Sequence, residues 1–413
     1  MPNSISALVR IIIVGGGFGG IRTALDLAKR RLPNVKIVLI SDKPHFEYHA
    51  ALYRVVTGRS PLEVCIPLQE IFAGKDIEVL QDTITEVNLK AKTLKGSSGS
   101  NYSFDFLILA LGSETVYFNI PGLKELSFGF KSISEALRLK RHLHELFNIS
   151  QETSLEKKVQ TAHIIVVGGG ASGVELAGEI AVYTKKLAKN HKLDPSLITI
   201  DLIEAAPRLL PALPEDISKK VEHRLRHLGV NIFLNRTVLK EDVEEVYLKD
   251  MEMKTKTVIW TAGVKPHHLY SQIGGLKFDQ KGRVVVDEFL QPQGFENVFV
   301  IGDAAATPYT GMAQTAIRDG KHVAQVIKRK LRGKPLLGYQ PKAPFYAIPV
   351  GPGWAAVIIN WLRFYGRIGW WLRRLADFRF FLSTLPPRKA ILAFQSGKTL
   401  CESCPICQPD ESL

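Results

Sequence analysis

The chain contains few cysteines, fewer acidic than basic residues, and no long apolar run free of proline and glycine. Its 413 residues include four cysteines, too few for the disulfide framework of a small secreted protein. No basic residue precedes Arg10, and the apolar run that follows leads into a glycine-rich turn, so we expect a first strand there and no signal peptide. Residues 344–362 are uncharged but carry three prolines and two glycines, which argues against a spanning helix. We therefore expect an intracellular protein without a transmembrane segment.

Acids are outnumbered, with 40 Asp and Glu against 54 Lys and Arg, a net charge of +14. Half of this surplus lies between Trp354 and Lys398, where eight basic residues face one acid, Asp377, and where four of the five tryptophans occur. A surplus of this size favours a polyanionic partner such as nucleic acid, an anionic membrane or a phosphate-bearing ligand.

Two βαβ units stand out in the pattern of the chain. In the first, the β-branched strand Val9–Val14 precedes a glycine run at 15–20, a helical pattern at Ile21–Arg30 and a second strand at Val35–Ile40. The same order recurs at His163–Val167, 168–173, Val174–Lys189 and Ile198–Ile203. The repeat predicts a domain-scale duplication. Further predictions are strands at Phe104–Ala110, Val258–Trp260 and Val298–Ile301, an amphipathic helix at Ile133–Phe147, and a polar connection at 151–160.

Both glycine runs fit the spacing G-x-G-x-x-G, at Gly15, Gly17 and Gly20 and again at Gly168, Gly170 and Gly173. The first glycine permits the tight turn, the second lets the backbone approach a pyrophosphate, and the third lets helix pack on strand. An acid follows the next strand in each unit, Asp42 and Glu204, suited to a ribose hydroxyl. Two dinucleotides in one chain favour hydride transfer from a nicotinamide cofactor to a flavin.

Five segments carry a resemblance to a known family: LYRVVTG at 52–58, FDFLILALGSETVYFNIPGL at 104–123, VVGGGASGVELAGEIA at 166–181, RLLPALPEDIS at 208–218 and VFVIGDAAA at 298–306. With them, the chain resembles the type II NADH dehydrogenases (NADH:quinone oxidoreductases) of the two-dinucleotide-binding flavoproteins over residues 8–345. The implied fold is α/β, with two Rossmann-like, glutathione-reductase-like domains and an amphipathic C-terminal segment. The implied domains are FAD-binding at 1–118 and 282–345, NADH-binding at 119–281, a membrane-surface segment at 346–399, and a cysteine-containing tail at 400–413.

The resemblance also implies site residues. FAD would be held by Gly15, Gly17, Gly20, Asp42, Ile84, Ala110, Gly112, Gly302 and Asp303. NADH would be held by Gly168, Gly170, Gly173, Glu175, Glu204, Ala262 and Gly263. Glu175 matches the acid that the family places near the nicotinamide. On the quinone side, Gln314 matches the first glutamine of the family pattern, whereas Arg318 replaces the second, which shifts the expected acceptor towards a different quinone or another carrier.

Two relatives are set aside because they need cysteines that the chain lacks. Disulfide reductases of this superfamily carry a redox cysteine pair soon after the FAD acid, and residues 43–64 contain none. Sulfide:quinone oxidoreductases need core cysteines near the flavin, where only Cys65 occurs. A lone buried cysteine usually acts as a small hydrophobe.

Tryptophan, tyrosine and arginine interleave between residues 354 and 389. This pattern is typical of an interfacial helix or helix pair on an anionic membrane, and Gly366 and Gly369 are candidate breaks. A homodimer interface and single-stranded nucleic-acid binding are the other readings. We predict peripheral attachment at the cytoplasmic face of the membrane through this segment, a possible homodimer and no nucleic acid.

The last segment contains Cys401, Cys404 and Cys407. Three thiolates could bind zinc or take part in redox chemistry, but a fourth ligand is missing, so we predict an inert tail and no metal. Two alternatives to quinone reduction remain. One is a soluble reductase of a ferredoxin- or rubredoxin-like protein, and the other is an NADH-binding flavoprotein that acts through interactions.

The acid Glu204 predicts a preference for NADH over NADPH. A carboxylate about 4 Å from a 2′-phosphate, at an effective dielectric near 20, would repel it by roughly 4 kcal/mol at most. Steady-state kinetics with both cofactors should show the higher kcat/KM with NADH. Equal or better efficiency with NADPH would contradict the assignment.

Overall fold

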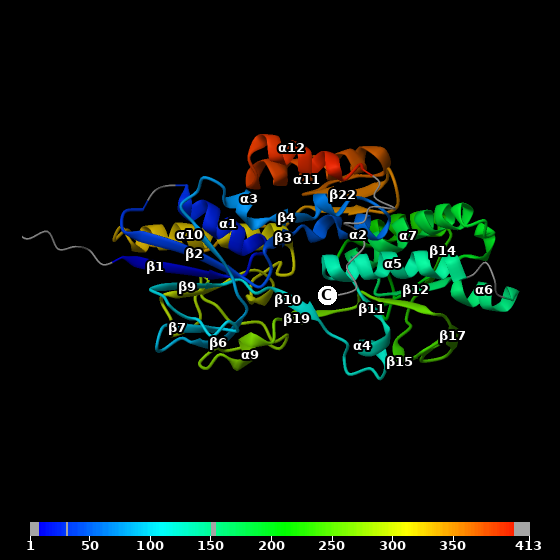
Figure 1. The fold of residues 1–413 in the computed structure, drawn as a ribbon, viewed down its shortest axis with the longest axis horizontal. Coiled ribbons are helices and arrows are strands. Elements are labelled where there is room, and N and C mark those ends of the chain that lie inside the picture. Colours follow the sequence, from blue (N-terminus) through cyan, green and yellow to red (C-terminus); the bar gives the residue numbers. More distant parts are fainter. Residues whose placement is uncertain (1–7, 30–31, 150–153, 400–413) are drawn as a thin grey trace, which may run out of the picture.

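The computed structural model describes residues 8–29, 32–149 and 154–399, and Figure 1 shows two α/β lobes side by side with the C-terminal helices above their junction. The first lobe is built on a five-stranded sheet in which every neighbouring pair is parallel. In spatial order its strands are β20 (Val298–Val300), β9 (Phe106–Leu109), β1 (Val9–Val14), β2 (Val35–Ser41) and β5 (Glu78–Gln81).

The second lobe repeats this arrangement. Its parallel sheet runs β11 (Phe128–Gly129), β18 (Thr257–Trp260), β12 (His163–Val167), β13 (Thr199–Ile203) and β14 (Val230–Phe233). Each lobe also carries a small antiparallel sheet, β6 (Ile84–Asn88), β7 (Thr93–Gly96) and β8 (Asn101–Ser103) in one and β15 (Val238–Asp242), β16 (Glu245–Leu248) and β17 (Glu252–Lys254) in the other. The predicted duplication and the two-domain α/β fold are confirmed.

Helices cover both sheets. In the first lobe α1 (Phe18–Ala28) packs on α10 (Ala313–Lys330), where a Cβ added at Gly320 would lie only 2.6 Å from the carbonyl oxygen of Gly19. The second lobe carries α5 (Ile133–Ile149), α6 (Leu155–Thr161), α7 (Ala171–Asn190) and α8 (Glu215–Leu228). The short helices are α2 (Leu52–Val56), α3 (Leu68–Phe72), α4 (Leu123–Leu126) and α9 (Leu269–Gln272). The connection predicted at 151–160 therefore contains the start of α6, and residues 151–153 lie outside the described ranges.

The chain crosses between the lobes twice, and the two crossings pair with each other. β10 (Ser113–Thr115) on the way out runs antiparallel to β19 (Val264–Pro266) on the way back, at the centre of Figure 1. β20 follows the second lobe in sequence but joins the first sheet, so the first lobe is made from two separate stretches of chain. Domain boundaries at 118/119 and 281/282 remain our proposal.

After α10, residues 346–396 form a cap. It begins with an antiparallel sheet of β21 (Tyr346–Pro349), β22 (Ala355–Ile359) and β23 (Leu362–Phe364), and ends with α11 (Gly366–Thr384) and α12 (Pro387–Ser396). The prediction of a helix or helix pair over residues 354–389 is thus wrong for the first part of the segment, which forms β22 and β23. Gly366 begins α11, whereas Gly369 lies inside it, where an added Cβ would meet the carbonyl oxygen of Ala355 at 2.2 Å. Of the described helices, none is long and apolar enough to span a bilayer.

The inner face of α11 carries buried charge. Arg373 and Arg374 are 5% and 4% exposed and both pair with the fully buried Asp377. Arg374 also pairs with Glu63 at 2.6 Å, and Arg54 of α2 reaches Glu63 at 2.7 Å. We counted Arg373 and Arg374 among the cations facing a membrane, and this was wrong. They hold the cap onto the first lobe.

Removal of Asp377 tests this attachment. Asp377→Ala would leave Arg373 buried without a counter-charge and Arg374 with Glu63 as its remaining partner, and an unpaired buried charge typically destabilises a protein by about 3–5 kcal/mol. The matched control is Asp216→Ala, because Asp216 pairs with Arg363 at the surface, where an ion pair contributes under ~1 kcal/mol. Urea unfolding of both variants should show a large loss for the first and a small one for the second. Similar losses would contradict the proposed attachment.

Candidate functional site

The first glycine of each loop sits where no side chain fits. Gly15 and Gly168 both have φ of +116°, a conformation that residues with a Cβ avoid. A Cβ on Gly15 would lie 2.3 Å from the carbonyl oxygen of Ala110, and one on Gly168 would lie 2.9 Å from Ala262. Each loop therefore turns tightly against the end of the neighbouring strand.

The second and third glycines differ in their surroundings. A Cβ on Gly17 or Gly170 would meet nothing within 4 Å, whereas one on Gly20 would lie 2.0 Å from the carbonyl oxygen of Gly15. Gly17 and Gly170 are also the N-caps of α1 and α7, so unpaired N–H groups and a positive helix end face the open space. Both loops fit the pyrophosphate of a dinucleotide.

The two predicted ribose acids directly follow β2 and β13, as expected. Asp42 is exposed directly after β2. The carboxylate of Glu204 is held by two backbone N–H groups, Gly169 to Oε2 at 2.5 Å and Ala206 to Oε1 at 2.7 Å. Arg208, the basic residue nearest to Glu204 downstream, donates to carbonyl groups of its own loop, including that of Pro211 at 2.6 Å. The charged side chains that line the cleft beside the second glycine loop are Glu204 and Arg236, and Arg236 pairs with Asp250 at 2.9 Å.

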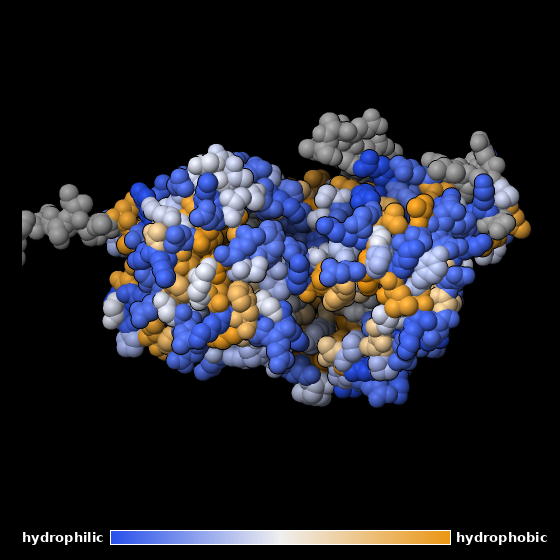
Figure 2. Space-filling view, turned by 90° about the horizontal axis from the view of Figure 1, so that it is seen from below, coloured by the Kyte–Doolittle hydropathy of each residue, from blue (hydrophilic) through white to orange (hydrophobic). Residues whose placement is uncertain are grey.

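A cleft of about 590 Å³ opens beside the second loop. It is lined by Gly168, Gly170, Glu204, Trp260 and Ala262, among others. Figure 2 shows a hollow with hydrophobic walls on this face of the molecule, near the junction of the lobes. The structure thus gathers most of the predicted NADH residues around one cavity. Gly263 lies just beyond, where an added Cβ would meet Phe118 and Val116 at 2.9 Å.

Around the first loop, two side chains fix the turn that ends β20. Asp319 of α10 is fully buried and its Oδ2 accepts a hydrogen bond from the N–H of Gly302 at 3.0 Å. Ser113 donates to Oδ2 of Asp303 at 2.5 Å. Burial raises the pKa of Asp319 to about 6. The sequence analysis missed Asp319, although an acid on the apolar side of an amphipathic helix indicates a buried partner.

The remaining predicted FAD residues surround the first loop less closely. Gly112, with φ of +71°, faces open space, and Ala110 touches Gly15 through its carbonyl group. Ile84 begins β6 with its side chain buried and pairs with Gly96 of β7. These contacts account for the place of Ile84 in the small sheet, and its contact with FAD stays a prediction.

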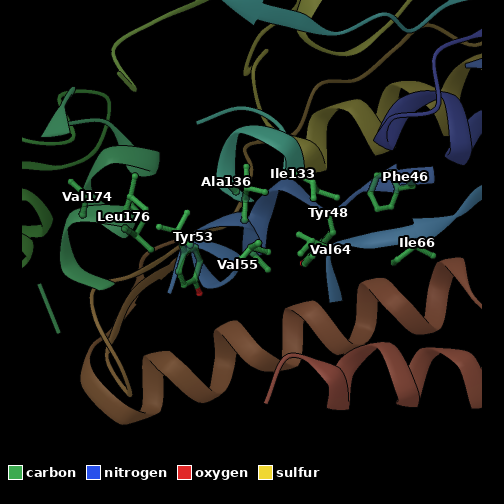
Figure 3. Close-up of a cluster of buried hydrophobic side chains, with 14 of the residues drawn as sticks. Phe46, Tyr48, Tyr53, Val55, Val64, Ile66, Ile133, Ala136, Val174 and Leu176 are labelled. Atoms are coloured by element: carbon green, nitrogen blue, oxygen red, sulfur yellow. The ribbon is translucent and has the colours of Figure 1, made fainter. Parts of the chain in front are cut away.

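Glu175 lies in the first half of α7 with a half-buried side chain. Burial raises its pKa to about 8, although the charges of Arg373 and Arg54 act in the opposite direction. Glu179, one turn further on, has its pKa raised by burial to about 7. Figure 3 shows Tyr53 of α2 between α7 and the ribbon of α11. The positive charge of Arg373 in the cap thus acts to lower the pKa of Glu175, the acid predicted beside the nicotinamide. No local pattern in the sequence indicates this influence.

The predicted quinone-side residues, Gln314 and Arg318, both form hydrogen bonds with the backbone of residues 342–345. Gln314 donates from Nε2 to the carbonyl oxygen of Phe345 at 2.8 Å and accepts from the N–H of Phe345 at 3.1 Å. Arg318 donates to the carbonyl groups of Lys342 and Ala343. The structure brings the two together along α10, with both side chains turned to 342–345.

Cys65 is half-buried in β4 (Cys65–Pro67) and makes no disulfide. Cys401, Cys404 and Cys407 lie outside the described residues.

Comparisons with known proteins agree with this geometry. Residues 9–320 match the pyridine nucleotide-disulphide oxidoreductase family. The type II NADH:quinone oxidoreductase Ndh of Mycobacterium tuberculosis is 32% identical over 342 residues, which cover 78% of this chain and 73% of that protein. The type II NADH:quinone oxidoreductase of Staphylococcus saprophyticus is 27% identical over 79% of this chain and 83% of its own length. The fold is shared with NDH2 of Plasmodium falciparum in complex with NADH, with a TM-score of 0.84, 20% identity, and coverage of 95% of this chain and 98% of that one.

Gly170 offers a test of the second loop that separates binding from folding. Its φ of −71° suits alanine and an added Cβ meets no atom, so Gly170→Ala should keep the unfolding midpoint. The methyl group would occupy the space of the pyrophosphate, and we expect KM for NADH to rise about tenfold or more, the equivalent of ~1.4 kcal/mol, at unchanged flavin content.

The control is Gly173→Ala, whose Cβ would lie 1.9 Å from the carbonyl oxygen of Gly168 and should lower the unfolding midpoint. An unchanged KM in Gly170→Ala would show that the dinucleotide binds elsewhere.

Proposed function

Because the chain belongs to the type II NADH:quinone oxidoreductases, within the pyridine nucleotide-disulphide oxidoreductase family, we propose that it oxidises NADH and passes two electrons through a bound FAD to a quinone. The observation that carries this proposal is the pair of glycine loops, 15–20 in the first lobe and 168–173 in the second. In each loop, a Cβ added at the second glycine would meet no atom within 4 Å. We call each loop, together with the helix N-terminus that follows it, a glycine cradle. A chain with one such cradle could bind one dinucleotide. Two cradles can bind both the electron donor, NADH, and the electron carrier, FAD.

In this proposal each lobe has its own cofactor. The first loop and Asp42 hold FAD, and the second loop, Glu204 and the cleft beside it hold NADH. When bound, a flavin supplies the chemistry of accepting a hydride and giving up two electrons to another acceptor. No proton pumping is part of this reaction.

The protein's own residues would hold the turn beside the flavin in place and supply or accept a proton. Asp319 fixes the N–H of Gly302, and Ser113 fixes the carboxylate of Asp303, so the turn after β20 is rigid where the flavin would meet it. Quinone reduction takes up one proton in addition to the hydride. Glu175, with its pKa raised to about 8 by burial, can hold or release a proton near neutral pH.

The outer face of α11 supports attachment to a membrane surface. Ile368, Trp371 and Leu375 follow helical spacing and are 64%, 66% and 61% exposed, and Trp361 at the tip of the β22–β23 hairpin is 83% exposed. Exposed basic residues of the same segment include Arg367, Arg379 and Arg388, whereas the exposed Arg363 and Lys389 pair with Asp216 and Glu70. Tryptophan and arginine favour the headgroup region of an anionic bilayer. We place the protein peripherally at the cytoplasmic face, where NADH is available.

One experiment tests both halves of the proposal. The purified protein should oxidise NADH with a short-chain soluble quinone, and also with a long-chain quinone embedded in anionic liposomes. Trp371→Glu with Leu375→Glu should keep the first activity and lose most of the second, because two carboxylates on the apolar face oppose binding to the bilayer.

The matched control, Val159→Glu with Val243→Glu, adds the same charge at exposed positions of the second lobe and should keep both activities. Failure of the unaltered protein to reduce any quinone, with rapid reduction of a ferredoxin-like carrier, would overturn the proposed function. Full liposome activity in the α11 variant would overturn the membrane contact alone.

A further inference from the structure

A group of metal-binding side chains meets where the chain crosses between the lobes. Glu114 lies in β10, and His267 and His268 directly follow β19. Their ligand atoms all lie within 4.8 Å of one another, and Oε2 of Glu114 is 3.0 Å from Nδ1 of His268. None of the three belongs to the dinucleotide sites proposed above.

The backbone that carries these side chains is fixed by pairing. Glu114 stands opposite Lys265 in the antiparallel pair of β10 and β19. The N–H of His267 donates to the carbonyl oxygen of Gly112 at 3.2 Å. Glu114 therefore projects from a strand, and the two histidines project from the residues directly after its partner strand, where the hydrogen bond to Gly112 holds the backbone of His267.

We propose that Glu114, His267 and His268 bind one divalent transition-metal ion of the Zn²⁺ class across the two crossings. Two imidazoles and a carboxylate form a donor set that Zn²⁺ uses when it keeps a fourth position open for water or another ligand. Imidazole nitrogen disfavours Mg²⁺ and Ca²⁺, which select oxygen. The side chain of His268 is 59% exposed and that of Glu114 is 30% exposed, so the fourth position opens to solvent.

Two adjustments accompany binding, and both involve accessible side chains. The rings of His267 and His268 are stacked with centroids 4.3 Å apart, and a metal bonds in the plane of each ring, so the more exposed His268 turns. Lys265, whose side chain is 53% exposed, is 3.3 Å from Oε1 of Glu114 and swings into solvent. Neither change requires the backbone to move.

The location gives the ion a consequence. A bound metal would cross-link the outgoing and returning strands beside Gly112, one of the predicted FAD residues. We therefore expect Zn²⁺ to slow NADH oxidation reversibly by stiffening the junction. This consequence rests on the proposed function, whereas the binding itself does not.

The test is a titration of the flavin-loaded full chain after chelation. Zn²⁺ is followed by calorimetry, and Co²⁺ by the visible absorption that a tetrahedral site produces. All proteins carry Cys401→Ser, Cys404→Ser and Cys407→Ser so that tail thiolates do not contribute. We expect one equivalent of Zn²⁺, bound at least tenfold more weakly after His267→Gln with His268→Gln, and likewise after Glu114→Gln.

The control variant is His223→Gln with His227→Gln, since this pair lies one turn apart on the exposed side of α8 and could bind metal independently. Equal affinity in the parent and the His267/His268 variant, or loss only in the α8 control, would overturn the proposal. In the activity arm, Zn²⁺ should inhibit the parent but not the His267/His268 variant, and EDTA should restore the rate. A protein that oxidises no NADH would contradict the proposed function and leave the titration readable.

Discussion

The structure depends on one steric constraint, applied twice. A strand, a loop and a helix must turn so tightly that backbone touches backbone, and yet leave a space at the helix N-terminus large enough for a pyrophosphate. The third glycine of each loop satisfies the first demand, because a Cβ at Gly20 or Gly173 would lie within 2.0 Å of a carbonyl oxygen. The second glycine satisfies the other demand. The helix that follows each loop also directs its unpaired N–H groups at that space.

Two such cradles are useful only if they keep a fixed relation, and two separate contacts provide it. The paired crossings β10 and β19 join the lobes at their centre. The cap joins them at the top, because Arg373 and Arg374 of α11 share a buried ionic network with Arg54 of α2 in the first lobe, and Arg224 of α8 in the second lobe donates to the carbonyl oxygen of Val350 in the cap at 3.3 Å. Buried ion pairs are weak contributors to stability but demanding in geometry. Here these ion pairs would fix α11 in one position relative to the glycine loops.

The sequence predicted the elements that local pattern determines. The bounds of β1 and β12 agree with prediction to the residue, because β-branched runs that end in a glycine turn leave little freedom. Both glycine loops, and the acids after β2 and β13, follow from spacing alone. The seating of Arg374 could not be predicted, because its partner Glu63 is 311 residues away. The role of Arg373 depends on which helices pack together, whereas Asp319 could have been suspected from its place on the apolar side of α10.

The basic C-terminal segment illustrates how packing redistributes charge that composition only counts. One side of α11 turns Arg373 inward, where its charge opposes the burial that raises the pKa of Glu175. The other side turns Ile368, Trp371 and Leu375 outward with Arg367 and Arg379. A single helix thus touches both the environment of the predicted catalytic acid and the surface proposed to meet lipid. Because the inner contacts are ionic and buried, a shift of α11 would alter the electrostatic environment of Glu175 directly. The arginines of this segment therefore differ in position: Arg373 and Arg374 are buried in the ionic network, and only the exposed ones are available to the anionic surface that we propose.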